Sequence, residues 1–225
     1  MPYILSYRGQ QRLAVAGLIT CLIALSAELT VHMADHMARG GTVAGAGALL
    51  DFVSYYTVGS NILLVVVYAA HLSRARALRI LRDTRVRTMA AAMITLVMRV
   101  YLFILSRVEA PQGLGKISAV LAHYIAPPLY IAWWTATSHR DWIGLRDLPF
   151  MIAPSIGYMS YVLLLGHLTG RYPYAMLDAD RLSIWGMVLH GMGLLLALLA
   201  ACSLFIALGR WRYVKVERHR HGDAR

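Results

Sequence analysis

Long apolar stretches separated by short polar joints make up most of the chain. They lie at residues 13–34, 48–71, 88–107, 117–138, 148–169 and 183–209. Each stretch has about the 20 residues that a helix needs to cross the hydrocarbon core of a bilayer. The pattern therefore predicts an all-α polytopic membrane protein, with one domain over residues 1–225 that folds as a bundle of six transmembrane helices.

The amino-acid composition agrees with this class. The chain is 59% hydrophobic, whereas soluble domains have roughly 45–50% apolar residues. The two cysteines, Cys21 and Cys202, both lie inside apolar stretches and lack the spacing of a zinc site. We therefore expect no metal, no disulfide framework and no cofactor.

The basic residues predict the orientation of the helices. The N-terminus, the second and fourth joints and the C-terminal tail together contain 16 Lys and Arg residues, and the other three joints contain 5. By the positive-inside rule, this bias places both termini in the cytoplasm. Because the basic residues flank apolar stretches, the net charge of +11 indicates contact with membrane lipids and not with nucleic acid.

Polar residues recur inside the apolar stretches at a similar depth. With a rise of about 1.5 Å per residue, Glu28, Thr57, Arg99, His123 and His190 all lie roughly 9–14 Å below the outer surface. An ionisable group in hydrocarbon is costly and is usually functional. We expect these side chains to neutralise one another or to line one cavity.

The second apolar stretch has a polar face. At about 100° per residue, Asp51, Ser54, Thr57 and Asn61 fall within an arc of about 120° on a continuous helix. The opposite side carries Leu and Val and can face lipid. This face can bond neighbouring helices or line a functional site.

The fourth stretch carries a histidine ahead of a proline pair. Pro127 and Pro128 have no backbone N–H, so the carbonyls of His123 and Tyr124 lose their usual partners four residues on. The sequence predicts a kink here. Exposed backbone oxygen suits either a water-filled pocket or a bond from a neighbouring helix.

Three segments resemble a predicted six-pass bacterial membrane protein family. They are residues 55–61, residues 123–128 and the loop at residues 170–178. Their order and the layout of the stretches extend the resemblance over nearly the whole chain. That family is distantly similar to the androgen-induced six-pass proteins of animals, which are intramembrane threonine hydrolases that cleave fatty acid esters of hydroxy fatty acids.

The resemblance implies catalytic residues and a location. By position, Thr57 matches the catalytic threonine and His123 the catalytic histidine, with Pro128 five residues after it. The animal pattern has an Asp three residues after the threonine, where this chain has Ser60 and then Asn61. The implied protein is a lipid ester hydrolase of the bacterial cytoplasmic membrane, with substrate entering laterally from the lipid.

Such a hydrolase would form an acyl-threonine, because a threonine hydroxyl becomes a nucleophile when a neighbouring base such as His123 takes its proton. Either Asp51 or Glu28 is expected to orient the imidazole. Donors for the oxyanion are expected from Asn61 and Arg99, and Arg99 alternatively binds a substrate carboxylate. The residues expected to support substrate or transition state are Asn61, Arg99, Asp51, Ser60, Glu28, His190, Tyr172 and Asp178.

Two other classes of function stay open. In the first, the polar layer is a binding site of a lipid or small-molecule transporter, and Thr57 is dispensable. In the second, paired histidines hold a haem, with His123 and His190 as the outer pair and His71 and His139 as the inner pair. Small residues in the sixth stretch permit close helix packing within or between chains, so an oligomer is also open.

Overall fold

The computed structural model describes residues 5–39, 44–73, 75–138, 142–178 and 182–222. No strand occurs in these ranges, which confirms the all-α class. Five of the described helices are long and apolar enough to cross a membrane. They are α1 (Tyr7–Arg39), α3 (Tyr56–Ser73), α4 (Thr84–Phe103), α7 (Leu148–Thr169) and α8 (Ile184–Gly222).

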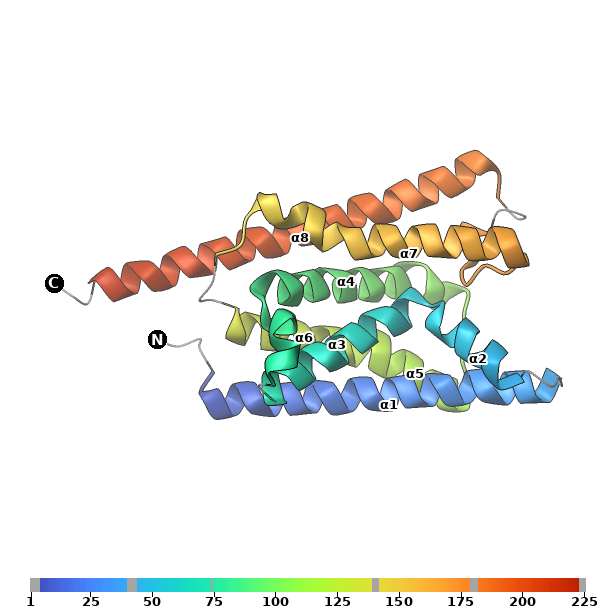
Figure 1. Cartoon of the computed structure of the whole chain (residues 1–225), viewed down its shortest axis with the longest axis horizontal. Coiled ribbons are helices and arrows are strands. Elements are labelled where there is room, and N and C mark those ends of the chain that lie inside the picture. The colour runs from blue at the N-terminus through green and yellow to red at the C-terminus, as the bar shows by residue number, and fades with distance from the viewer. Residues whose placement is uncertain (1–4, 40–43, 74, 139–141, 179–181, 223–225) are drawn as a thin grey trace.

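The helices lie along one long axis, with α1 on one side of the bundle and α7 and α8 on the opposite side (Figure 1). The start of α1 and the end of α8 lie at the same end of this axis. Short 3₁₀ segments lie in the joints, at Arg76–Arg82 (η1), Leu105–Arg107 (η2), Leu145–Asp147 (η4) and Ala175–Leu177 (η5). Part of the core is aromatic: the Tyr68 ring meets Tyr130 and Trp133 edge to face, and these two rings are tilted against each other.

The predicted fourth stretch is an uninterrupted helical run with a change of pitch. It consists of α5 (Gly113–Val120), a π-helical turn η3 (Leu121–Ile125) and α6 (Ala126–Thr137). In the π turn, the N–H of Ala126 donates to the carbonyl of Leu121, five residues back. The prolines that follow cannot supply the α-helical bonds. The irregularity expected beside His123 is therefore this π turn.

The second stretch differs from the continuous helix predicted over residues 48–71. It is divided into α2 (Ala44–Val53) and α3, with Ser54 and Tyr55 between them. Ser54 follows α2, and its Oγ donates to the Leu50 carbonyl over 2.6 Å. The predicted polar arc on one helix is therefore wrong for Asp51, which lies on α2, whereas Thr57 and Asn61 lie one turn apart on α3.

Side chains of α7 bond the two helices at this break. The Tyr158 hydroxyl donates to the Ser54 carbonyl over 2.8 Å, and the Tyr161 hydroxyl lies 3.0 Å from Ser54 Oγ. The Tyr56 hydroxyl lies 2.7 Å from Ser155 Oγ. An interrupted helix in an apolar bundle needs such partners for its backbone groups. These bonds explain why α7 carries hydroxyl groups in an otherwise apolar sequence.

Replacement of Tyr158 tests whether this bond supports the fold. Tyr158→Phe leaves the Ser54 carbonyl without its donor, and we expect a loss of about 1–3 kcal/mol in the free energy of unfolding. The measurement is the apparent unfolding midpoint of the detergent-purified protein. Tyr124→Phe is the matched control, because Tyr124 is 44% exposed and meets Tyr101 only at a ring edge. Equal midpoints for the two variants would contradict the role of Tyr158.

Candidate active site between two cavities

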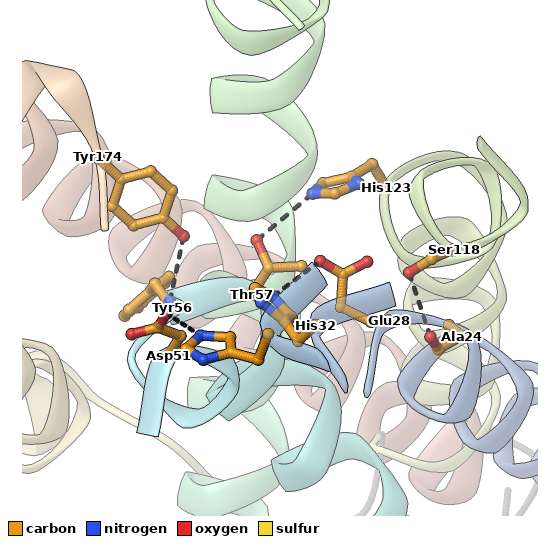
Figure 2. A network of polar contacts seen from close by, with 10 residues as sticks. Ala24, Glu28, His32, Asp51, Tyr56, Thr57, Ser118, His123 and Tyr174 are labelled. Atoms are coloured by element: carbon orange, nitrogen blue, oxygen red, sulfur yellow. Dashed lines mark hydrogen bonds and ion pairs between the residues drawn. The ribbon is translucent and has the colours of Figure 1, made fainter. Parts of the chain in front are cut away.

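The predicted nucleophile and base lie within reach of each other. Thr57 is the second residue of α3, and His123 is in the π turn and is 9% exposed. The distance from Thr57 Oγ1 to His123 Nε2 is 3.3 Å (Figure 2). This is long for a strong hydrogen bond, but catalytic hydrogen bonds are often long before substrate binds. The break before α3 and the π turn thus bring together residues 66 positions apart.

The other ring nitrogen of the imidazole is bonded to the backbone. His123 Nδ1 lies 3.0 Å from the Ala119 carbonyl oxygen, which can only accept. Nδ1 therefore carries the proton, and the lone pair of Nε2 faces Thr57. The Tyr101 ring stacks on the imidazole at a centroid distance of 3.9 Å and an angle of 18°. A backbone carbonyl and an aromatic ring thus fix the base.

Neither carboxylate expected to orient His123 does so. Asp51 Oδ2 lies 2.7 Å from Nε2 of His36 on α1, because the break in the second stretch moves Asp51 away from Thr57. Glu28 Oε1 lies 3.5 Å from Nε2 of His32, one turn along the same helix. The expectation that Asp51 or Glu28 orients the imidazole is corrected to the Ala119 carbonyl.

Tyr174 reaches the site, although from its loop only Tyr172 and Asp178 were expected to support the substrate or transition state. The N–H of Tyr56 donates to the Tyr174 hydroxyl over 3.1 Å, which places the phenol over the first turn of α3 (Figure 2). Burial raises the pKa of Tyr174 to about 12, and the nearby Thr57 hydroxyl and N–H act against this rise. Tyr174 is therefore a neutral phenol beside the candidate nucleophile. The sequence feature that could have pointed to Tyr174 is its position in the loop segment at residues 170–178.

Tyr172, expected to support the substrate or transition state, does not line either cavity. Its ring packs against Gly166 so closely that a Cβ added there would lie 2.0 Å from a ring carbon. Any larger residue at that position would require the Tyr172 ring to shift. The loop is therefore held to the end of α7 by Tyr172, and Tyr174, two residues on, reaches the site.

A large apolar cavity lies on one side of the Thr57–His123 pair. Its volume is about 450 Å³, and its walls come mainly from α4, α7 and α8. Representative apolar lining residues are Leu96, Val100, Met159, Leu163, Met192 and Leu195. This cavity suits a hydrocarbon chain.

A smaller and more polar cavity lies on the other side of the pair. Its volume is about 230 Å³, and it is lined from α1, α3, α5, the π turn and the loop after α4. Glu28, Asn61 and Glu109 contribute its polar groups. The residues common to both cavities are Thr57, Tyr101, Leu105, His123 and Tyr174. The candidate catalytic pair therefore stands in the wall between an apolar and a polar compartment.

Several predicted site residues lie outside this constellation. Arg99 is on an exposed side of α4, and His190 is exposed on α8, where its Nδ1 lies 2.8 Å from the Gly186 carbonyl. Ser60 is buried in α3, and Asp178 lies at the end of the described loop. None of these four is among the described residues that line the two cavities. Arg99 and His190 therefore lie on helix faces that do not line the two cavities.

The two histidines of the expected outer haem pair do not line a common cavity. His123 lines both cavities, whereas His190 lines neither. His71 lies against Trp133 and 3.3 Å from Gln11, and His139 lies outside the described residues. Within the described part of the chain, no group of three or more His, Cys, Asp or Glu side chains could hold a metal ion.

The bond to Ala119 predicts the tautomer of His123. We expect the neutral Nδ1–H form, because that nitrogen faces a carbonyl and Nε2 faces the Thr57 hydroxyl. The measurement is ¹⁵N NMR of histidine-labelled protein, with the His123→Gln variant assigning the signal. A proton on Nε2 with bare Nδ1 would contradict this geometry, since Nε2 would then have no lone pair for Thr57.

Comparisons of the chain with protein-family models, with curated proteins and with solved structures gave no match. The resemblance to six-pass bacterial proteins and to threonine hydrolases therefore stays a prediction. What indicates chemistry in this molecule is the arrangement of Thr57, His123 and the cavities around them.

Proposed function

We propose that the chain is an intramembrane lipid ester hydrolase in which Thr57 is the nucleophile and His123 the base. One observation carries the proposal. Thr57 Oγ1 lies 3.3 Å from His123 Nε2, while His123 Nδ1 is bonded to a carbonyl, and both side chains line both cavities. An ester bound across this wall has its acyl chain in the apolar cavity and its alcohol part in the polar one.

The first half of the reaction makes an acyl-threonine. Thr57 Oγ1 attacks the ester carbonyl carbon as its proton passes to His123 Nε2. The tetrahedral intermediate then collapses, the bond to the alcohol oxygen breaks, and that oxygen takes the proton from Nε2. The alcohol leaves through the polar cavity while the acyl group stays on Thr57.

The second half uses water. His123 Nε2 takes a proton from a water molecule in the polar cavity, and the resulting hydroxide attacks the acyl carbon. The bond to Thr57 Oγ1 breaks, and this oxygen takes the proton back from His123. The fatty acid is released, and both side chains return to their starting state.

The negative charge that develops on the carbonyl oxygen needs preorganised donors. The Tyr174 phenol is the candidate donor from the loop, and the first turn of α3 adds the positive end of its helix dipole. The expected donor Arg99 lies outside the cavities, and one N–H of Asn61 Nδ2 is committed to the Thr57 carbonyl over 2.9 Å. Tyr174 therefore replaces them in this proposal.

The same proposal includes six passes with both termini in the cytoplasm. It is supported by the bias of Lys and Arg in the joints and by the start of α1 and end of α8 at one end of the bundle (Figure 1). The run from α5 to α6, fourth along the chain, then adds one crossing to the five long apolar helices and makes six. The site lies toward the outer face of a bacterial cytoplasmic membrane, and lipid enters laterally beside α7, which buries few of its side chains.

Transport or storage of a lipid without chemistry is the alternative use of the same cavities. It requires the cavities but not the Thr57–His123 pair. Loss of the Thr57 hydroxyl separates the two functions, because it abolishes hydrolysis and leaves binding in place.

Hydrolysis of 4-nitrophenyl oleate by the detergent-purified protein tests the proposal. We expect Thr57→Ala to lower kcat/KM at least about 100-fold and His123→Gln to lower it about 100- to 10,000-fold, because each removes a partner in proton transfer. Tyr174→Phe should lose about 100-fold through the oxyanion. Thr57→Ser should keep measurable activity.

Thr135→Ala and Tyr124→Phe are the matched controls, since both residues lie outside the cavities. Each variant must elute as a single species in gel filtration. Equal rates for wild type, Thr57→Ala and His123→Gln would exclude the pair, and an inert wild type would favour the transport alternative.

Cysteine labelling in intact cells tests the orientation. Gln112→Cys lies in the exposed joint after η2 and Arg76→Cys in η1. A membrane-impermeant maleimide should label Gln112→Cys directly and Arg76→Cys only after permeabilisation. The native Cys21 and Cys202 are buried and should give little background. The reverse pattern would place both termini outside the cell.

A further inference from the structure

The smaller cavity has a bias toward hydrogen-bond acceptors. Its charged side chains are the carboxylates of Glu28 and Glu109, and no Lys or Arg occurs among the described residues that line it. Ser118 also lines it, but its hydroxyl already donates to the Ala24 carbonyl over 3.1 Å. The phenols of Tyr55, Tyr101 and Tyr174 also line the cavity, but its charged groups are acceptors, and they favour a ligand that brings donors.

Asn61 provides an independent sign of a missing ligand. This side chain lines the smaller cavity and is 1% exposed. Its Nδ2 donates to the Thr57 carbonyl over 2.9 Å, which identifies the other amide atom as oxygen, because a carbonyl can only accept. That Oδ1 is buried and has no partner in the described part of the chain. A buried acceptor without a donor is costly, and a ligand hydroxyl would satisfy it.

The carboxylates limit the charge of the ligand. Glu28 lies beside His32, with 3.5 Å between Oε1 and Nε2, and Glu109 lies in the exposed loop at the cavity edge. A carboxylate or phosphate placed here would meet like charge in a partly apolar setting. Arg99, which was expected to bind a substrate carboxylate, is on an exposed side of α4. A hydroxy fatty acid with a free carboxylate therefore fits this cavity poorly.

We propose that the smaller cavity binds the alcohol part of a lipid ester as an uncharged, hydroxyl-rich group such as glycerol, with the single acyl chain in the larger cavity. The substrate class is then a monoacylglycerol or a similar polyol ester. The identity of the bond that is cut rests on the proposed hydrolase function, whereas the binding preference rests on the cavity alone.

Binding to the Thr57→Ala protein tests the cavity without hydrolysis. The probes are 1-O-oleylglycerol and O-oleylglycolic acid, two ethers with one chain and different head groups, followed by tryptophan fluorescence in detergent at pH 7. We expect the glycerol ether to bind at least about tenfold more tightly. Adding Glu28→Gln to this protein should lower the ratio of the two affinities, because it removes a charge that repels the carboxylate of O-oleylglycolic acid.

Asp35→Asn is the matched control, since it removes one negative charge from an exposed position on the same helix. It should leave the ratio unchanged. Equal or reversed affinities for the two ethers, or no binding of either, would overturn the assignment of the cavity.

The hydrolysis of two natural-type esters tests the substrate class. The ratio of kcat/KM for 1-monooleoylglycerol to that for the oleate ester of 12-hydroxystearic acid should exceed about ten and fall in Glu28→Gln and Asn61→Ala. This ratio does not depend on the folded fraction of each sample. If the protein cleaves 4-nitrophenyl oleate but prefers the carboxylate ester, the hydrolase proposal stands and this inference fails. If no ester is cleaved but the glycerol ether is preferred, the cavity assignment stands and the hydrolase proposal fails.

Discussion

A backbone N–H or carbonyl in the interior of a lipid-embedded bundle has no water to bond, so every interruption of a helix must find a partner. This chain interrupts its helices at the Ser54–Tyr55 break and at the π turn. The break is bonded by hydroxyls of α7 and of the loop that follows α7. The π turn satisfies part of its backbone with the Ala126-to-Leu121 bond. The candidate site lies where these interruptions meet, and the need to partner their backbone groups determines which residues surround it.

As a consequence, neighbouring parts of the bundle contribute different parts of the candidate site. The break turns Thr57 into a first-turn residue of α3, and the π turn presents His123 toward it. The aromatic side chains Tyr101 and Tyr174 complete the wall between the cavities. An apolar cavity and a more polar one then lie on opposite sides of the same pair, which is the arrangement on which the proposed ester hydrolysis rests.

Much of the fold and the central pair could be predicted from the sequence, because both depend on position along the chain. The apolar stretches follow from composition, and the similar depths of Thr57 and His123 follow from helical rise. The break at Ser54 could not be predicted, since no Gly or Pro marks it and the bonds that stabilise it come from α7. Asp51 was misplaced for that reason. Depth along a helix also does not fix which face of the helix a residue lies on, so the sequence could not show that Arg99 and His190 lie outside the cavities.

The Thr57–His123 contact is made by α3 and the π turn, whereas α7 and α8 form much of the wall of the larger cavity. Side chains such as Met159, Leu163, Met192 and Leu195 line that cavity without being among the residues shared with the smaller one. Exchange of a bulky residue for a small one on these two helices alters the space for a hydrocarbon chain and leaves the reacting atoms in place. In the proposed hydrolase, chain-length selectivity and bond cleavage would thus be separable properties, and each could change without the other.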